Sequence, residues 1–245
     1  MFEKWKNVRN QLDFFIRSRI RFERDLPPQF KIPESEMAFQ REMDGFFDLL
    51  KVRAKLNPSQ KEWVICDVGT KNFSLAPVLD KIFLSKNLNV KIHGIEMDAY
   101  RRLSSFYTRA DYARYFSRLA RDARFHPIDF LKFKEPLDVV FLLNPFVSKA
   151  PLLAWGLPTK FLKPKEIFKH AFELLKTKNG FLVLSSPSLD ELEIASSFAK
   201  ETGFQLGELT IWNPSSKTIQ KKARFGRLCY STVEKVSDSG SRGID

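Results

Sequence analysis

The sequence predicts a mostly parallel α/β sheet of seven strands with helices on both faces. Short apolar runs alternate with helical patterns five times along residues 60–201, which is typical of parallel strands joined by crossover helices. Two final apolar runs, residues 204–212 and 227–234, follow without a helix between them. We therefore expect the last two strands to be antiparallel neighbours in an otherwise parallel sheet.

The first 57 residues are expected to form a helical cap on this sheet. Apolar residues at helical spacing define one face of a first helix: Val8, Leu12, Phe15, Ile16 and Ile20. Pro27 and Pro28 end that helix, because proline disfavours a helical residue before it. A second helix is predicted over residues 34–56. The pattern leaves open whether the cap only adds stability or also covers a ligand.

The stretch that organises the rest of the chain joins the first strand to the first helix of the sheet. The apolar run 63–66 ends at Asp67, Val68 and Gly69, and after a polar turn the helical pattern 73–84 follows. A strand, a glycine-containing turn and a helix open a βαβ unit. In such a unit, backbone N–H groups and the positive end of the helix lie beneath a ligand.

An acid also stands at the end of the second predicted strand, residues 90–95, where Glu96, Met97 and Asp98 follow in turn. An acid at this position can accept hydrogen bonds from both hydroxyls of a ribose. Asp98 is better placed as the N-cap of the next helix. The ends of these two strands are therefore a candidate nucleoside-binding site with Glu96 on the ribose, although Glu96 could also be a solvated acid at a strand end and Asp67 a cap of the turn.

The other elements complete the alternation. Residues 99–123, rich in arginine and tyrosine, are expected to form one long helix or two consecutive ones. The later elements are expected in this order: a strand at 124–128, Asp129 and Phe130, a strand at 137–143, an irregular loop at 148–164, a helix at 165–176, a strand at 181–185 and a helix at 188–201. The main domain then spans residues 58–235, and the polar tail 236–245 is expected to be disordered.

Charge bears on the class of partner. A net charge of +12 and a pI near 9.7 permit a polyanion such as nucleic acid, although a basic proteome background would give the same balance. The arginines of residues 99–124 could contact phosphates, or could simply form the solvent face of an amphipathic helix. A second basic group comprises Lys217, Lys221, Lys222, Arg224 and Arg227.

Other classes of site are disfavoured. Two separate cysteines and three scattered histidines predict no metal site. The start of the chain lacks the apolar core of a signal peptide, and no apolar run approaches the roughly 20 residues that span a bilayer. We therefore expect a cytoplasmic protein without a membrane partner. Its substrate and its oligomeric state stay open.

The order of the predicted strands and helices resembles that of the class I S-adenosylmethionine-dependent methyltransferases over about residues 60–235. In that family the first strand ends in an acid–x–Gly–x–Gly–x–Gly turn, and Asp67 and Gly69 match its beginning. Lys71 and Phe73 stand where the second and third glycines usually lie. The resemblance implies a Rossmann-like fold with S-adenosylmethionine as cofactor.

The resemblance also implies a set of ligand contacts. Glu96 matches the acid that binds the ribose, and Asp129 with Phe130 matches the pair beside the adenine. The implied cofactor-binding residues are Asp67, Gly69, Thr70, Lys71, Glu96, Met97, Asp129, Phe130 and Asn144. A lysine at position 71 would crowd the cofactor or place a cation beside its sulfonium, unless it points outward or holds the cofactor carboxylate.

A last motif concerns the reaction. Asn144, Pro145, Phe146 and Val147 resemble a shortened form of the Asn-Pro-Pro-aromatic motif of amino methyltransferases. The resemblance implies that Asn144 and Phe146 are catalytic residues, which position a nitrogen or oxygen nucleophile for methyl transfer. An Asn-Pro pair is also a common turn, so a purely structural role stays open.

Two other interpretations remain. A nicotinamide-binding domain would need Gly-x-Gly-x-x-Gly at the first turn, where only Gly69 is present. A non-catalytic protein of the methyltransferase fold, acting by binding a partner such as nucleic acid, would agree with the altered glycine motif.

Overall fold

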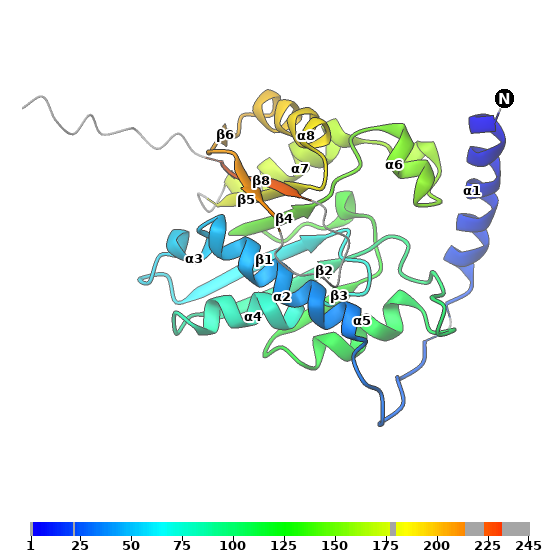
Figure 1. Ribbon diagram of the computed structural model, residues 1–245, viewed down its shortest axis with the longest axis horizontal. Helices are drawn as coiled ribbons and strands as arrows, with labels where there is room; N and C mark the ends of the chain where they lie inside the picture. Colours follow the sequence, from blue (N-terminus) through cyan, green and yellow to red (C-terminus); the bar gives the residue numbers. More distant parts are fainter. Residues whose placement is uncertain (1, 22, 177–179, 214–222, 232–245) are drawn as a thin grey trace, which may run out of the picture.

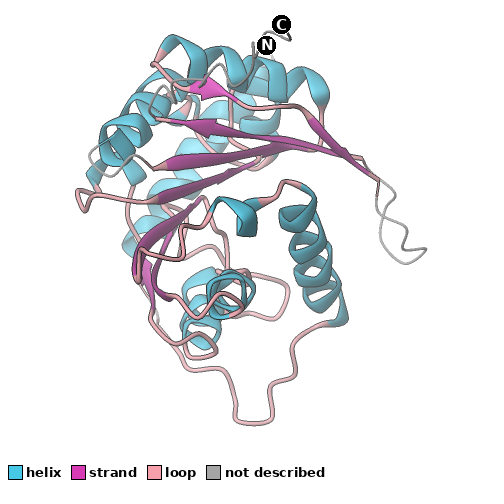
Figure 2. Cartoon of the chain, turned by 90° about the vertical axis from the view of Figure 1, so that its left-hand side faces the viewer, coloured by secondary structure: helices cyan, strands magenta, loops and turns pink. Residues whose placement is uncertain are grey.

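The computed structural model describes residues 2–21, 23–176, 180–213 and 223–231. Their strands form one twisted sheet that lies between two layers of helices (Figure 2). The strands are β1 (Glu62–Val68), β2 (Asn89–Ile95), β3 (Ala123–His126), β4 (Val139–Leu143), β5 (Phe181–Ser186), β6 (Gln205–Leu206), β7 (Thr210–Trp212) and β8 (Arg224–Tyr230). The order across the sheet is β3-β2-β1-β4-β5-β8-β6 (Figure 1). Strand β7 also pairs with β8.

The predicted sheet topology is confirmed. The first five strands pair in parallel, and β8 pairs antiparallel with β5, β6 and β7. The sheet has eight strands rather than seven because the predicted strand 204–212 is interrupted. Gly207 donates its N–H to the Leu228 carbonyl at 2.7 Å, between the β6 and β7 pairings. The last strand begins earlier than predicted, and residues 232–245, with the predicted tail, lie outside the described residues.

The helices form the two outer layers. On one face lie α2 (Glu34–Leu49), α4 (Ala76–Leu84) and α5 (Arg109–Ser117), and on the other lie α7 (Pro164–Lys176) and α8 (Leu189–Glu201). Each layer has its own apolar core against the sheet. None of the helices in the described parts of the chain is both long and apolar enough to span a bilayer.

The predicted second cap helix is divided in two. It ends at Leu49, and α3 (Val52–Lys55) follows after Lys51, whose φ is 59°. A residue in this left-handed conformation commonly ends a helix. Met43, Phe46 and Phe47 of α2 are fully buried, so this helix is part of the main core.

The first cap helix, α1 (Phe2–Arg19), packs differently from the prediction. Val8, Leu12, Phe15, Ile16 and Ile20, the expected packed face, are all exposed. Only Asn10 is buried among the residues of α1, all of which are described. The periodicity located the apolar face correctly, but it could not show which face of the helix the domain covers.

The prediction of a helix from residue 99 is wrong for its first part. Residues 99–107 form turns and a bridge between Arg102 and Thr108, and α5 begins only at Arg109. The start is fixed by a capping box, in which Thr108 and Asp111 exchange side-chain and backbone hydrogen bonds. The loop expected at 148–164 contains α6 (Lys149–Ala154) and a 3-10 turn, η2 (Thr159–Phe161).

Candidate functional site

A cavity of about 300 Å³ lies at the carboxyl ends of β1 and β4. The strand order reverses between these two neighbours, and ligands of open α/β sheets bind at such a point. The turn after β1 forms one side of the cavity, and the start of α2 forms another. The cavity lining includes Glu36, Asp67, Lys71, Arg109, Asn144 and Trp155.

The turn after β1 keeps a backbone that glycine favours at three positions. Gly69, Lys71 and Phe73 have φ angles of 69°, 59° and 60°. These are the three positions at which the family resemblance expects glycine. Non-glycine residues in this left-handed conformation cost about 1–2 kcal/mol each. The conformation of the turn is therefore retained even though two of its residues carry side chains.

The Phe73 side chain fills space beneath the turn. Its ring is fully buried and its centroid lies 6.2 Å from that of Phe125. A Cβ atom on Gly94 of β2 would lie 2.5 Å from the same ring, so glycine is needed there. Sequence reasoning did not single out Gly94, although an isolated glycine inside an apolar strand often marks a close approach of this kind.

Asp67 is a buried carboxyl at the end of β1, with 2% of its surface exposed. Its Oδ2 accepts a hydrogen bond from the Thr70 hydroxyl at 2.5 Å. Burial raises the pKa of Asp67 to about 7, the Thr70 hydrogen bond opposes this, and the Glu96 charge adds to it. Asp67 therefore changes protonation state near neutral pH.

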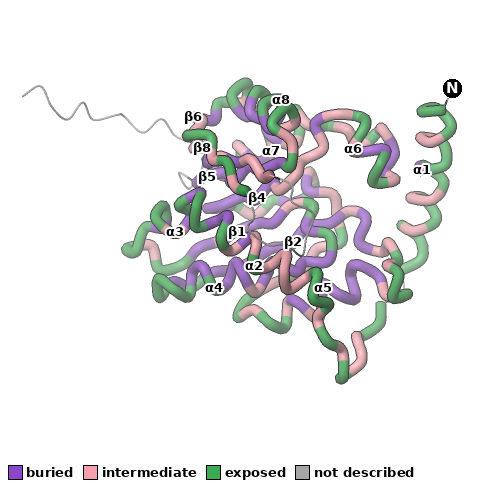
Figure 3. The backbone as a smooth tube through the Cα atoms, viewed as in Figure 1, coloured by how far each residue is buried: buried purple, intermediate pink, exposed green. Residues whose placement is uncertain are grey.

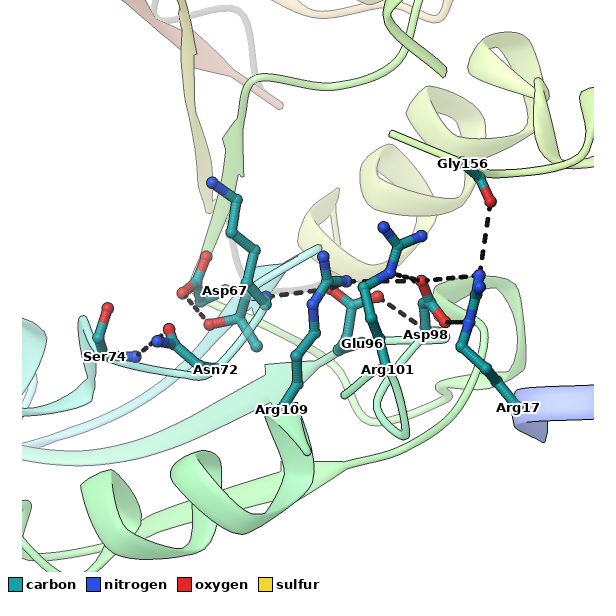
Figure 4. Close-up of polar contacts among 11 residues, drawn as sticks. Arg17, Asp67, Asn72, Ser74, Glu96, Asp98, Arg101, Arg109 and Gly156 are labelled. Carbon is teal, nitrogen blue, oxygen red and sulfur yellow. Dashed lines mark hydrogen bonds and ion pairs between the residues drawn. The ribbon is translucent and has the colours of Figure 1, made fainter. Parts of the chain in front are cut away.

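Glu96 connects the ends of β1 and β2 (Figure 4). The backbone N–H of Lys71 donates to its Oε2 at 3.0 Å, and the backbone N–H of Asp98 donates to Oε1 at 2.8 Å. Arg109 Nη1 lies 3.5 Å from Oε2. Burial raises the pKa of Glu96, and the charge of Arg109 opposes that rise. The acid is buried and does not line the cavity.

Asp98 is surrounded by arginines and is not the N-cap that the sequence predicted (Figure 4). Arg17 Nε donates to it at 3.1 Å, and Arg101 Nε donates to it at 2.5 Å. Arg109 lies 3.8 Å away. Through Arg17, this cluster joins α1 to the end of β2.

Lys71 places a cation in the cavity. Its Nζ lies 4.5 Å from the centroid of the Trp155 ring, and the guanidinium of Arg109 lies 5.6 Å from the same ring. No carboxylate of the described residues forms an ion pair with Lys71 within 4.0 Å. Burial lowers the pKa of the Lys71 ammonium, and the nearby charge of Arg109 lowers it further.

Asn144 lines the cavity at the end of β4 with a φ of 63°. Its Oδ1 accepts a hydrogen bond from Arg224 Nη1 at 3.2 Å, and its N–H donates to the Ser185 carbonyl at 2.8 Å. Phe146 is partly buried and packs on Trp155, with ring centroids 6.3 Å apart, outside the cavity lining. The amide oxygen of Asn144 thus already has one donor.

The structure divides the sequence-predicted residues into two groups. Asp67, Gly69, Thr70, Lys71 and Asn144 meet in the cavity, whereas Glu96, Met97, Asp129, Phe130 and Phe146 do not line it. Asp129 accepts a hydrogen bond from the Leu131 N–H at 3.0 Å, at the start of the 3-10 turn η1 (Phe130–Lys132). Phe130 is buried against His170.

Glu36, Arg109 and Trp155 are among the cavity residues that sequence reasoning missed. They come from α2, from α5 and from the segment after α6, and no motif connects these segments in the sequence. Arg109 gave no signal beyond belonging to an arginine-rich stretch. Trp155 stood in a segment interpreted as an irregular loop.

No family model and no curated protein matches the sequence. A structure of a Listeria monocytogenes protein assigned to the class I S-adenosylmethionine-dependent methyltransferases superposes with a TM-score of 0.53 at 11% identity, covering 99% of this chain and 72% of the other. Magnesium protoporphyrin IX methyltransferase from Synechocystis PCC 6803, with bound S-adenosylmethionine, superposes with a TM-score of 0.51 at 12% identity, covering 91% and 94%. Together with the sheet order, these similarities show that the chain has the Rossmann-like fold of the class I methyltransferases.

Proposed function

We propose that this protein is an S-adenosylmethionine-dependent methyltransferase whose cofactor lies over the Asp67–Lys71 turn. The observation that carries the proposal is the left-handed backbone at Gly69, Lys71 and Phe73. Lys71 and Phe73 keep this costly conformation at the positions where the family resemblance expects glycine, so the turn retains the shape of the cofactor-binding turn. The turn also lies at the reversal of the strand order, beside the buried carboxyl of Asp67.

The cavity fits the amino-acid end of this cofactor. That end carries an ammonium and a carboxylate, and the cavity offers the carboxyl of Asp67 and the ammonium of Lys71, which pairs with no carboxylate of the described residues. Asp67 would accept hydrogen bonds from the ligand ammonium, and Lys71 would donate to its carboxylate. Pairing with the cofactor carboxylate would also reduce the repulsion between the Lys71 ammonium and the cofactor sulfonium, because a paired lysine presents less net charge.

The ribose end requires a local rearrangement. Each oxygen of Glu96 accepts one backbone N–H, which leaves each with a further lone pair for a ribose hydroxyl. Arg109 lines the cavity and contacts Glu96, so its side chain would have to turn aside to let the ribose reach the acid. Met97, Asp129 and Phe130 stay proposals for the adenine side.

The cofactor supplies a methyl group that is already activated on a sulfonium, so the protein mainly has to position the acceptor. We propose that Asn144 orients a nitrogen or oxygen nucleophile through the lone pair of Oδ1 that Arg224 leaves free. Phe146 would support this side of the site by packing on Trp155. The acceptor itself is not identified by these contacts.

Calorimetric titration with S-adenosylmethionine and with its demethylated product tests the binding step. We expect both compounds to bind with one site per chain. Failure of both to bind would remove the methyltransferase proposal and leave a fold relative of another function.

A second candidate function is binding without catalysis, and the contact between Arg224 and Asn144 favours it. The Arg224 guanidinium already donates a hydrogen bond to the Asn144 amide oxygen, which a methyl-accepting amine would also need as its acceptor. Incubation with cofactor carrying a tritiated methyl group and with separate RNA, protein and small-molecule pools of a cell extract distinguishes the two. Label that enters one pool and falls at least about ten-fold with Asn144→Ala supports catalysis. Cofactor binding without label transfer supports the second candidate.

A further inference from the structure

Helix α1 is attached to the domain by its polar side. Asn10 Nδ2 lies 3.3 Å from the Leu153 carbonyl and 3.2 Å from that of Leu157, and donates to both. The Thr159 N–H donates to Asn7 Oδ1 at 2.9 Å. Arg17 completes the attachment through Asp98 and the Gly156 carbonyl (Figure 4). The chief apolar contact on this side is the ring of Phe14, 4.7 Å from that of Phe161.

The apolar side of α1 faces solvent. Seven large apolar residues of α1 and its C-terminal end are 44–80% exposed: Phe2, Trp5, Val8, Leu12, Phe15, Ile16 and Ile20. Spacings of three and four residues place them on one stripe of the helix. Figure 3 shows α1 at the edge of the molecule, largely exposed along its length. A surface helix normally packs its apolar side on the domain, whereas α1 packs its polar side. An exposed apolar stripe of this size commonly marks an interaction site.

Cations accompany the apolar stripe. Helical periodicity places four cations there, Arg9 and Arg19 within the stripe and Lys4 and Lys6 at its two borders, and Arg9 Nε lies 3.8 Å from Asp13 Oδ2. All four belong to a chain of net charge +12. In a symmetric dimer through this face, the same patch would meet itself and bring these cations together. An anionic surface would instead be attracted by them.

We infer that α1 docks flat on an anionic lipid surface, with its apolar stripe in the boundary between headgroups and acyl chains. Aromatic and aliphatic residues on one side, with lysine and arginine at the level of the headgroups, are the chemistry of helices that lie in a membrane interface. The inference is independent of the proposed enzymatic function. The sequence expectation of no membrane partner rested on the lack of a spanning segment, which a helix lying on the surface does not need.

Docking there would bring the candidate site close to the lipid. The segment under α1, from Leu153 to Thr159, includes Trp155, which lines the cavity. Figure 1 shows α1 beside α6 at the same edge. Docking through the apolar stripe would therefore place α1 between the lipid surface and this segment.

Co-sedimentation of the full chain with vesicles tests the inference. We expect binding to vesicles of equimolar phosphatidylcholine and phosphatidylglycerol, and little binding to pure phosphatidylcholine. The variant Trp5→Ser/Leu12→Ser should bind at least about ten-fold more weakly, since each lost side chain removes apolar burial in the interface. A matched control, Leu119→Ser/Ile194→Ser, removes residues that are 46% and 41% exposed elsewhere and should bind as wild type does.

A second variant separates charge from apolar contact. Arg9→Gln/Arg19→Gln should weaken binding to the anionic vesicles several-fold, and high salt should have the same effect on the wild-type protein. Thermal unfolding of all variants checks that the fold is retained. The inference is overturned if the wild-type protein binds neither vesicle, or if Trp5→Ser/Leu12→Ser binds as wild type does. A wild-type dimer that this variant converts to a monomer, without vesicle binding, assigns the face to a second copy instead.

Discussion

The Lys71 ammonium lies 4.5 Å from the centre of the Trp155 ring, at a position where the resembling family has glycine. The contact is a cation–π interaction, worth about 0.5–1 kcal/mol when it is accessible to solvent. It holds the cation inside the cavity, near the buried carboxyl of Asp67. If Lys71 had no role in the site, its side chain would be expected to point away from the cavity.

Lys71→Gly tests whether this lysine binds the cofactor carboxylate or crowds the cofactor. Affinity for S-adenosylmethionine should fall by about 1.5–3 kcal/mol, the range for hydrogen bonds to charged groups. Stability should stay constant or rise by up to about 1 kcal/mol, because glycine relieves the left-handed strain but gains entropy when unfolded. Calorimetry and thermal unfolding measure the two effects.

The control for Lys71→Gly is 5′-methylthioadenosine, which lacks the amino-acid end of the cofactor. It should bind the wild-type protein and the variant equally well. If Lys71→Gly bound S-adenosylmethionine more tightly than the wild-type protein does, the lysine would be an obstacle to the cofactor rather than a contact for it.

Glu96→Ala should lower both ligand affinity and stability. Loss of the acid leaves the backbone N–H groups of Lys71 and Asp98 without their acceptor, at about 1–3 kcal/mol for each buried donor. Affinity for S-adenosylmethionine should fall by a further 1.5–3 kcal/mol, about the worth of a bond to a charged group. Denaturant titration and calorimetry separate the two losses. Glu36→Gln, at another acid of the cavity, is the control, and a Glu96→Ala protein that binds normally contradicts the ribose placement.

Asp67 should make stability depend on pH between about 4 and 7. Burial raises the pKa of Asp67 in the folded state to about 7, from an ordinary value of 3.8, so over this range the folded state binds a proton that the unfolded state has lost. Stability therefore falls as pH rises through this window. The variant Asp67→Asn lacks this group and this loss of stability. The stability of the variant minus that of the wild-type protein should therefore increase by up to about 4 kcal/mol from pH 4 to pH 7.

The titration of other groups cancels in the stability difference between wild type and Asp67→Asn. Denaturant midpoints of both proteins at several pH values therefore measure the contribution of Asp67. A constant difference across the window would show that the Asp67 pKa is not raised. A ligand ammonium favours the charged form of Asp67, so affinity for S-adenosylmethionine should increase as pH rises through 7.

Gly94→Ala should destabilise the protein by about 1–3 kcal/mol, because the new methyl would overlap the Phe73 ring. The double variant Gly94→Ala/Phe73→Leu should recover part of that loss, since leucine leaves more space. Gly45→Ala in α2 is the matched control. Its new Cβ would meet only a Trp212 carbon at 4.0 Å, so it should be neutral or stabilising. Equal effects at both glycines would contradict the close packing at Gly94.

The sheet was predictable from the sequence because local pattern encodes it. Apolar runs located β1, β2, β4 and β5, and the acids at the ends of the first two, Asp67 and Glu96, followed from them. The antiparallel end was predictable because no helix separates the last strands. These features depend on residues close together in the chain.

Other features depend on contacts between distant segments, and local pattern does not encode those. The guanidinium carbon of Arg109 lies 5.6 Å from the centre of the Trp155 ring. Arg109 belongs to α5, whereas Trp155 belongs to the segment after α6. The sequence located the apolar stripe of α1, but the attachment of its opposite face depends on Asn10 and on carbonyls more than 140 residues away. The capping box at Thr108 was a readable signal that the arginine and tyrosine pattern obscured.

Arg114→Ala/Arg118→Ala tests whether α5 and its C-cap contribute to nucleic-acid binding. We expect the affinity for RNA and DNA to change by less than about two-fold, since acids already balance both cations. Arg118 pairs with Asp25 at 2.9 Å, and Arg114 lies 3.6 Å from Glu23 and 3.4 Å from Asp111. A mobility-shift assay over a range of salt concentrations measures this, because phosphate contacts make log affinity fall with log salt. Tight, salt-sensitive binding that the double variant abolishes would identify this helix as a phosphate-binding surface and would favour a nucleic-acid substrate.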